Sequence, residues 1–208
     1  MNELVIVRHG ETSGRSSVRF YGSTDVCLSG VGRKQMELTG SALGHIPFKT
    51  LVVSPLSRSR DSAEIVLDGC PPPRTIVEEE LREIDFGDWE GLTAGEIAER
   101  DPDSYFLWRE RGSRESFPGG ESHEAFFDRV SRAAVRVFEG IELPSLAVLH
   151  KGVIKGVIAG LLRVPVSELR DPGIELGSIH RLRPAQGSWE LVAMNETEHL
   201  GGYRLDHS

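Results

Sequence analysis

The chain has 208 residues, of which 38% are hydrophobic and 27% charged, which is typical of a soluble globular protein with one sizeable core or at most two small ones. Its formal net charge of -8 argues against nucleic acid or an anionic membrane as a partner. No apolar run approaches the length of a membrane span, and no basic stretch leads into an apolar leader with a cleavage site. Cys27 and Cys70 are too few for a disulfide framework and lack metal-ligand spacing, so we expect reduced thiols in the cytoplasm.

Short apolar runs alternate with helical patterns in the first half of the chain. The predicted elements are, in order, a strand at 4–7, a helix at 29–43, a strand at 51–53, a helix at 56–67 and a strand at 74–77. Ser29 is a suitable N-cap for the first helix, and Gly44 lies near its end. The polar, glycine-rich stretch between the first strand and this helix is predicted to be a loop.

The second half of the chain opens with helices and closes with strands. Thr93 and Glu96 have capping-box spacing and predict a helix that ends before Pro102. A turn at 118–120 precedes an amphipathic helix, because apolar residues recur there at alternating spacings of three and four. Its predicted apolar face consists of Phe127, Val130, Ala134, Val137 and Ile141. The remaining elements are a strand at 147–149, a helix at 152–162 and strands near 178–183 and 189–193.

Alternation of strands and helices predicts an α/β fold with a mostly parallel sheet and helices on both faces. The stretch from about 93 to 140 is helical and interrupts that alternation. We expect it to be a helical insertion that covers one end of the sheet. The whole chain, residues 1–208, is predicted to form a single domain with this insertion.

Chemically useful side chains follow three of the predicted strands. Arg8 and His9 come directly after the first strand, Arg58 follows the second, and His150 follows the strand at 147–149. Glu83 lies in the segment LREIDFGDWEG between them. Ligands of open α/β sheets bind at the carboxyl ends of the strands, so these five residues are predicted to surround one pocket.

This set of residues suits phosphoryl transfer. Guanidinium groups at Arg8 and Arg58 match the geometry of a phosphate and stay charged. The imidazole of His9 is a neutral nucleophile near pH 7 if its other nitrogen holds the proton in a hydrogen bond. His150, at a helix N-terminus, would donate to the phosphoryl oxygens, and a carboxylic acid would protonate the departing alkoxide. The scheme requires neither a metal nor a cofactor.

Each of these residues also has a structural interpretation when it is taken alone. A histidine before glycine is usually a turn or core residue, and Arg58 and Glu83 would ordinarily be solvated. Their joint placement at separate strand ends favours the catalytic interpretation. The other five histidines lack such placement, and we expect them to be structural: His45, His123, His180, His199 and His207.

Seven segments of the chain resemble the histidine phosphatase superfamily, which contains phosphoglycerate mutases and acid-type phosphatases. In chain order they are VIVRHGET, YGSTDVCLSGVGRKQ, SPLSRSRDSAEI, LREIDFGDWEG, FPGGES, VLHKGVIKGVI and MNETEHL. Arg-His-Gly alone is a weak signal, whereas this many segments in the order of the family are specific. The resemblance implies a three-layer α/β sandwich.

The resemblance also implies a role for each matching residue. His9 matches the nucleophile that forms phosphohistidine, and Glu83 matches the proton donor of the phosphatase branch. The groups that hold the phosphate are Arg8, Arg58 and His150, and the residues at the substrate mouth are Tyr21 and Gly22. Asp85 and Asp88 remain alternative acids.

Two positions depart from the family pattern. Arg15 stands where the family usually has asparagine, and Lys151 stands where it usually has glycine after the second histidine. Both changes add a cation near the predicted pocket. Either these cations contact a more anionic substrate, or both point to solvent.

The segments YGSTD and LREIDFGDWEG resemble those of α-ribazole phosphatases, which act in cobalamin synthesis. Cofactor-dependent mutases usually carry a longer insertion and an ERxYG-type segment, which this chain lacks. We therefore expect hydrolysis of a small phosphorylated metabolite, with α-ribazole phosphate as a candidate, by a monomer or homodimer. The alternatives are mutase-type phosphoryl transfer and a catalytically silent phosphate-binding regulatory module.

Overall fold

A six-stranded sheet forms the centre of the molecule. The computed structural model describes residues 2–44, 46–71, 73–111, 116–169 and 173–205. The strands are β1 (Leu4–Arg8), β2 (Thr50–Val53), β3 (Arg74–Val77), β4 (Ser145–Leu149), β5 (Ile179–Ala185) and β6 (Ser188–Glu196). Their order across the sheet is β3-β2-β4-β1-β5-β6. The first four strands are parallel to one another, and β5 is antiparallel to both of its neighbours, β1 and β6, so the prediction of a mostly parallel sheet is confirmed.

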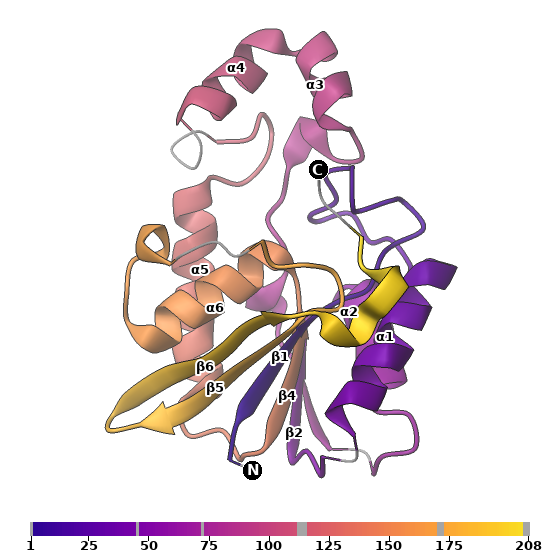
Figure 1. Cartoon of the computed structure of the whole chain (residues 1–208). Helices are drawn as coiled ribbons and strands as arrows, with labels where there is room; N and C mark the ends of the chain where they lie inside the picture. Colours follow the sequence, from indigo (N-terminus) through magenta and orange to yellow (C-terminus); the bar gives the residue numbers. More distant parts are fainter. Residues whose placement is uncertain (1, 45, 72, 112–115, 170–172, 206–208) are drawn as a thin grey trace.

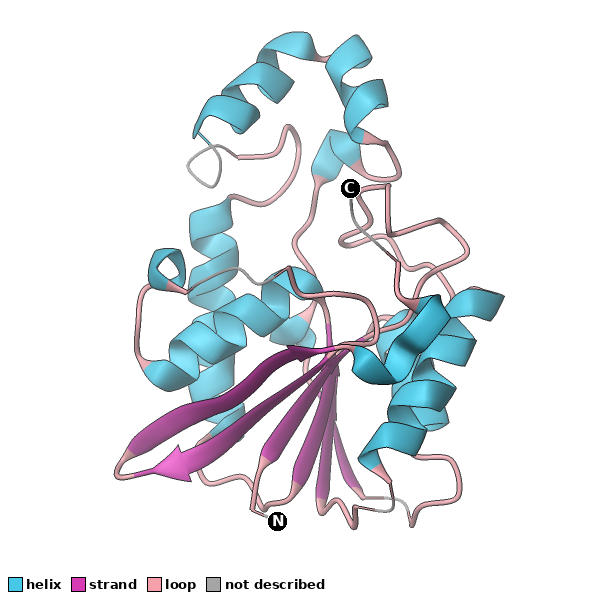
Figure 2. Ribbon diagram, in the orientation of Figure 1, coloured by secondary structure: helices cyan, strands magenta, loops and turns pink. Residues whose placement is uncertain are grey.

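Helices cover both faces of this sheet (Figure 1, Figure 2). The α-helices are α1 (Gly30–Leu43), α2 (Ser57–Val66), α3 (Ala94–Arg100), α4 (Pro102–Arg111), α5 (His123–Phe138) and α6 (Lys151–Leu162). Short 3₁₀ helices are η1 (Glu79–Leu81), η2 (Gly87–Trp89), η4 (Val166–Glu168) and η5 (Glu198–Tyr203). Within the described ranges, no helix combines the length and apolar character needed to cross a membrane.

Strand β1 shows why the sheet is buried on both sides. All five of its residues are buried. Leu4 and Ile6 pack into the core beneath α5 and α6, whereas Val5 and Val7 pack into the core beneath α1 and α2. Successive side chains of a strand point to opposite faces, so a continuous apolar run is required where helices cover both. The three-layer arrangement expected from the resemblance is confirmed.

The predicted helix caps are confirmed at two places. The Ser29 hydroxyl accepts a hydrogen bond from Gly32 N at 3.0 Å, and Gly44 ends α1 with a φ of 61°. Thr93 and Glu96 form the complete capping box at the start of α3. Both caps satisfy backbone N–H groups that lack a partner within the helix.

The buried face of α5 differs from the predicted one. Val130 and Ala134 are buried as expected, but the other predicted residues are only partly buried or lie beyond the helix end at Phe138. The residues that complete the buried face are Phe126, Ala133 and Phe138. This face packs closely on α6, where a Cβ at Gly152 would lie 3.0 Å from Phe126 and a Cβ at Gly156 would lie 2.6 Å from Val130.

The helical stretch from 93 to 140 contains two structurally different parts. Helices α3 and α4 lie beyond the carboxyl ends of the parallel strands (Figure 1). Trp108 of α4 joins an aromatic cluster with Phe20 and Trp89, and its ring centroid lies 5.8 Å from the centroid of each. Helix α5 instead returns to the sheet and packs along α6. Helices α3 and α4 therefore cover the strand ends, and α5 belongs to a helical layer.

Candidate active site

The two histidines that follow β1 and β4 lie side by side. These strands are neighbours, and their register pairs Arg8 with Leu149. The residues that come next, His9 and His150, are therefore adjacent, and the His9 N–H donates to the Leu149 carbonyl at 3.0 Å. Their ring centroids are 5.1 Å apart. Sheet register therefore brings the two residues together.

The ring of His9 is held in a single tautomer by its own backbone. Its Nδ1 lies 2.8 Å from the Gly10 carbonyl oxygen, which only accepts, so Nδ1 carries the proton and Nε2 presents a lone pair. The pKa of His9 is well below its ordinary value, because the ring is buried and the cations Arg58 and Arg8 lie close. The imidazole is thus neutral, with an unprotonated Nε2.

His150 is held in the opposite tautomer by Arg58. The Arg58 Nε–H donates to His150 Nδ1 at 3.3 Å, which leaves the proton of the neutral ring on Nε2. That Nε2 is buried and has no hydrogen-bond partner among the described residues. Burial, followed by the nearby Arg58, His9 and Arg8, keeps the pKa of His150 well below its ordinary value. The site therefore pairs one lone-pair nitrogen with one N–H donor.

Two arginines supply positive charge to this site. Arg58 is fully buried on α2, and its other nitrogens donate to the carbonyls of Thr24 at 2.8 Å and Gly22 at 2.7 Å. Arg8 donates to the Ile174 carbonyl at 2.7 Å. Burial lowers the pKa of Arg8 to about 10, against the opposing effect of nearby Glu83 and Glu11, so Arg8 stays charged at neutral pH.

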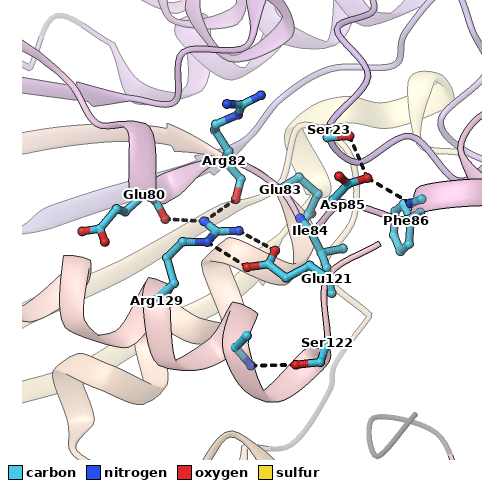
Figure 3. Close-up of polar contacts among 12 residues, drawn as sticks. Ser23, Glu80, Arg82, Glu83, Ile84, Asp85, Phe86, Glu121, Ser122 and Arg129 are labelled. Atoms are coloured by element: carbon cyan, nitrogen blue, oxygen red, sulfur yellow. Dashed lines mark hydrogen bonds and ion pairs between the residues drawn. The ribbon is translucent and has the colours of Figure 1, made fainter. Parts of the chain in front are cut away.

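Glu83 is anchored at the N-terminus of α6. Its Oε2 accepts from Gly152 N at 3.0 Å and its Oε1 accepts from Ile84 N at 3.0 Å. A Cβ at position 152 would lie only 2.7 Å from Oε1, so glycine is needed for this contact. The alternative acid Asp85 is instead bound by Ser23 and the Gly87 N–H, each at 2.9 Å (Figure 3).

A cavity of about 350 Å³ opens beside these residues. Its lining residues are Arg8, His9, Ser16, Ser17, Val18, Arg19, Phe20, Tyr21, Glu83, Phe86 and Lys151. Of the three candidate acids, Glu83 alone lines it, because Asp85 and Asp88 do not reach it. Arg58 and His150 are fully buried and are not among these lining residues. Gly22 is also buried and holds Arg58 through its carbonyl group.

The two departures from the family pattern lie in different places. Lys151 is exposed and lines the cavity from the first turn of α6. Arg15 is exposed, has a φ of 63°, and is not among the residues that line the cavity. Only Lys151 is therefore placed to meet a ligand in this cavity.

Glu90 is a site residue to which the sequence pattern assigned no role. Its carboxylate accepts from the backbone N–H groups of Gly22, Ser23, Thr24 and Phe86 at 2.9 to 3.3 Å. Since Gly22 and Thr24 in turn accept from Arg58, Glu90 fixes the loop that holds this arginine. Three of these donors, on Gly22, Ser23 and Thr24, are 66 to 68 residues away in the chain, so no local pattern predicts the contact.

No cluster of three or more histidine, cysteine, aspartate or glutamate side chains suited to a metal ion occurs in the described part of the chain. A groove between α1 and α2 has a larger volume, about 740 Å³. It contains no histidine and is lined mainly by carboxylates and small residues. The convergence of histidines and arginines therefore favours the smaller cavity as the functional site.

Comparison with known proteins decides the family. The family model of the histidine phosphatase superfamily (branch 1) matches residues 4–197. The chain belongs to the histidine phosphatase superfamily. The predicted resemblance is thus confirmed.

Curated and solved members of this superfamily match nearly the whole chain. The adenosylcobalamin/alpha-ribazole phosphatase of Salmonella typhimurium is 31% identical over 194 residues, which cover 93% of this chain and 91% of that protein. Phosphoserine phosphatase 1 of Hydrogenobacter thermophilus is 27% identical over 207 residues, or 99% and 98% of the two chains. The crystal structure of the alpha-ribazole phosphatase from Shigella flexneri has a TM-score of 0.81 at 26% identity and covers 93% of this chain and 96% of that chain.

Proposed function

We propose that this protein is a phosphatase that hydrolyses a small phosphate monoester through a phosphohistidine at His9. The observation that carries the proposal is the locked tautomer of His9. Its Nδ1 proton is held by the Gly10 carbonyl, so a neutral Nε2 lone pair lies among Arg8, Arg58 and His150. Phosphoryl transfer needs such a nucleophile together with donors for three charged oxygens.

In the first step, the Nε2 lone pair of His9 forms a bond to phosphorus and the bond from phosphorus to the ester oxygen breaks. The protonated carboxyl of Glu83 gives its proton to the departing oxygen. Arg8, Arg58 and the Nε2–H of His150 stabilise the charge on the phosphoryl oxygens.

In the second step, water attacks phosphorus and the bond to Nε2 breaks. The Glu83 carboxylate accepts a proton from the attacking water. Orthophosphate leaves, and His9 recovers its lone pair. Glu83 ends the cycle protonated, as it began, so one group serves as acid and then as base.

The apolar part of the cavity lining indicates the kind of alcohol that leaves. Val18, Phe20, Tyr21 and Phe86 line the cavity, and the rings of Phe20 and Phe86 meet edge to face at 5.1 Å. Such a wall favours a flat, apolar group over a small polar one. This agrees with α-ribazole phosphate as the candidate substrate, which the name of the Salmonella relative also suggests. Lys151 at the cavity would meet any further anionic group.

The test is turnover of p-nitrophenyl phosphate with a metal chelator present, followed by a panel that includes α-ribazole phosphate and phosphoserine. We expect chelator-resistant hydrolysis and an acid-labile phosphoenzyme, both abolished in His9→Ala and both retained in His123→Ala, a histidine of α5 that does not line the cavity. A phosphoenzyme in His9→Ala would contradict the assignment. Absence of turnover on every ester would favour a phosphate-binding module, and conversion of 3-phosphoglycerate with a bisphosphoglycerate primer would favour a mutase.

A further inference from the structure

The segment that carries Glu83 lacks regular secondary structure. Residues 82–86 connect η1 to η2 and belong to no strand or helix. Their backbone groups therefore lack the ladder of hydrogen bonds that holds the strand-end residues His9 and His150 in place. A general acid must nevertheless lie within hydrogen-bond reach of the ester oxygen, and errors of about 1 Å cost up to about 100-fold in rate.

Arg129 of α5 binds the backbone on one side of Glu83. Its Nη1 donates to the Glu80 carbonyl at 2.6 Å and to the Arg82 carbonyl at 3.2 Å (Figure 3). Its Nε and Nη2 donate to the two carboxylate oxygens of Glu121 at 3.0 and 2.7 Å. The guanidinium carbon also lies 5.2 Å from the ring centroid of Phe126. One planar group thus makes four hydrogen bonds and a ring contact.

Glu121 binds the backbone on the other side of Glu83. Its N–H donates to the Asp85 carbonyl at 2.9 Å. The Arg129–Glu121 ion pair therefore connects to the carbonyls of Arg82 and Asp85, which flank Glu83 closely in the chain. Both partner side chains are only 21% exposed, so water screens this pair less than the more exposed ion pairs of the same helix.

The same helix also supports the other contact of Glu83. Phe126, whose ring lies beneath Arg129, would be 3.0 Å from a Cβ at position 152. Gly152 is the residue whose N–H binds the Glu83 carboxylate. Helix α5 thus contacts both the backbone that carries Glu83 and the residue that holds its side chain.

We propose that the Arg129–Glu121 pair positions Glu83 for proton transfer to the leaving group. The proposal rests on the proposed function, in which Glu83 is the acid. Arg129 is a positioning residue, because it acts through the backbone and does not line the cavity. The planar guanidinium of Arg129 is needed for these contacts, since a lysine has a single nitrogen and cannot bind two carbonyls and both carboxylate oxygens at once.

The experiment compares two esters of similar size whose leaving groups differ in their need for a proton. Benzyl phosphate releases a poor leaving group, and p-nitrophenyl phosphate releases a good one. We expect Arg129→Met to lower kcat/KM for benzyl phosphate about tenfold more than for p-nitrophenyl phosphate, which is less than the loss of about 100-fold or more for a removed general acid, because Glu83 is displaced and not removed. Labelling of His9 by p-nitrophenyl phosphate should persist. Arg129→Lys should lower kcat/KM less, and again more for benzyl phosphate than for p-nitrophenyl phosphate.

Arg136 provides a matched control on the same helix. It pairs with the side chains of Glu78 at 3.0 Å and Glu80 at 2.6 Å, and not with a backbone carbonyl of the acid segment. Arg136→Met also removes one positive charge, and it should change kcat/KM for both esters equally or not at all. Equal slowing of the two esters by Arg129→Met, as a general loss of structure would give, overturns the proposal.

Glu83→Gln, assayed in parallel, separates this proposal from the function on which it rests. If Glu83→Gln loses more kcat/KM for benzyl phosphate than for p-nitrophenyl phosphate and Arg129→Met does not, the positioning role alone is overturned. If Glu83→Gln lowers kcat/KM for both esters equally, the acid assignment is overturned and the positioning role with it. Should Arg129→Met fail to fold, Glu121→Gln replaces it, since it removes the charged acceptor but keeps the N–H that binds Asp85, and the same comparison of esters decides.

Discussion

At the scale of single residues, the chemistry depends on which ring nitrogen carries each proton. His9 donates through Nδ1 to a carbonyl oxygen, whereas His150 accepts at Nδ1 from a guanidinium. Two histidines 5.1 Å apart between centroids thereby differ at Nε2, where His9 presents a lone pair and His150 an N–H group. Burial keeps both rings neutral by lowering the pKa of each well below the ordinary value.

Gly152 is the residue whose substitution should disturb the acid most directly. An alanine Cβ would lie 2.7 Å from Glu83 Oε1, so the carboxylate must move. We expect Gly152→Ala to lower kcat/KM for benzyl phosphate by about tenfold to 100-fold, with a smaller loss for p-nitrophenyl phosphate. Gly30→Ala, at a glycine with open space around it, is the control and should keep full activity. If Gly152→Ala leaves the ratio of kcat/KM for the two esters unchanged, Gly152 does not position the Glu83 carboxyl group.

At the scale of elements, close packing of α5 on α6 connects the core to the site. Helix α6 begins directly after His150 and places Gly152 against Glu83, while α5 carries Arg129. Glycines on α6 allow α5 to approach, since Gly156 faces Val130 and Gly160 faces Ser131. The buried face of α5 is therefore determined by the neighbouring helix as well as by its own periodicity.

Gly156→Ala tests this contact. Its Cβ would lie 2.6 Å from Val130 in a fully buried environment, and overpacking of this kind costs about 1–3 kcal/mol. We expect a loss of that size in urea-induced unfolding. The matched control is Gly95→Ala in α3, where the nearest atom is 4.0 Å away, and where alanine should be neutral or stabilise by up to about 1 kcal/mol. Equal stability of both variants would show that α5 and α6 are not closely packed.

At the scale of the whole molecule, buried neutral histidines make stability depend on pH. His180 of β5 accepts at Nδ1 from Asn195 N at 3.2 Å, and burial together with Arg8 lowers its pKa to about 3. Below pH 6.5 the unfolded chain binds a proton at this residue and the folded protein does not. The contribution of neutral His180 to the free energy of unfolding is therefore fully present above pH 6.5 and is lost as the pH falls toward 3. The lowered pKa values of His9 and His150 make the free energy of unfolding fall with decreasing pH in the same way.

We therefore expect the free energy of unfolding to fall between pH 6.5 and pH 5, with about 1.6 kcal/mol of the loss due to His180. Urea-induced unfolding of wild type and His180→Gln at the two pH values measures this share. The variant should lose less stability than wild type over the interval, whatever its stability at pH 7. An identical loss in the two proteins would show that His180 is protonated in the folded state.

Local signals in the sequence determined the strand–helix alternation, the caps at Ser29 and Thr93, and the residues that follow the parallel strands. Such signals depend on side chains within about one helical turn or on a short continuous apolar run, so the sequence alone is enough to find them. Parallel strands bring their carboxyl ends to one edge, and for this reason Arg8, His9, Arg58 and His150 could be grouped before the structure was known.

Only the tertiary structure decided the register that pairs β1 with β4, the tautomers, and the contacts made across long distances in the chain. Glu90 binds a loop about 66 residues away, and Arg129 binds carbonyls 47 and 49 residues away. A carboxylate or guanidinium that satisfies distant backbone groups leaves no periodicity and no spacing in the sequence. The sequence alone therefore predicted the chemical groups of the site, whereas the arrangement that holds Glu83 and Arg58 in place depends on how the loops meet.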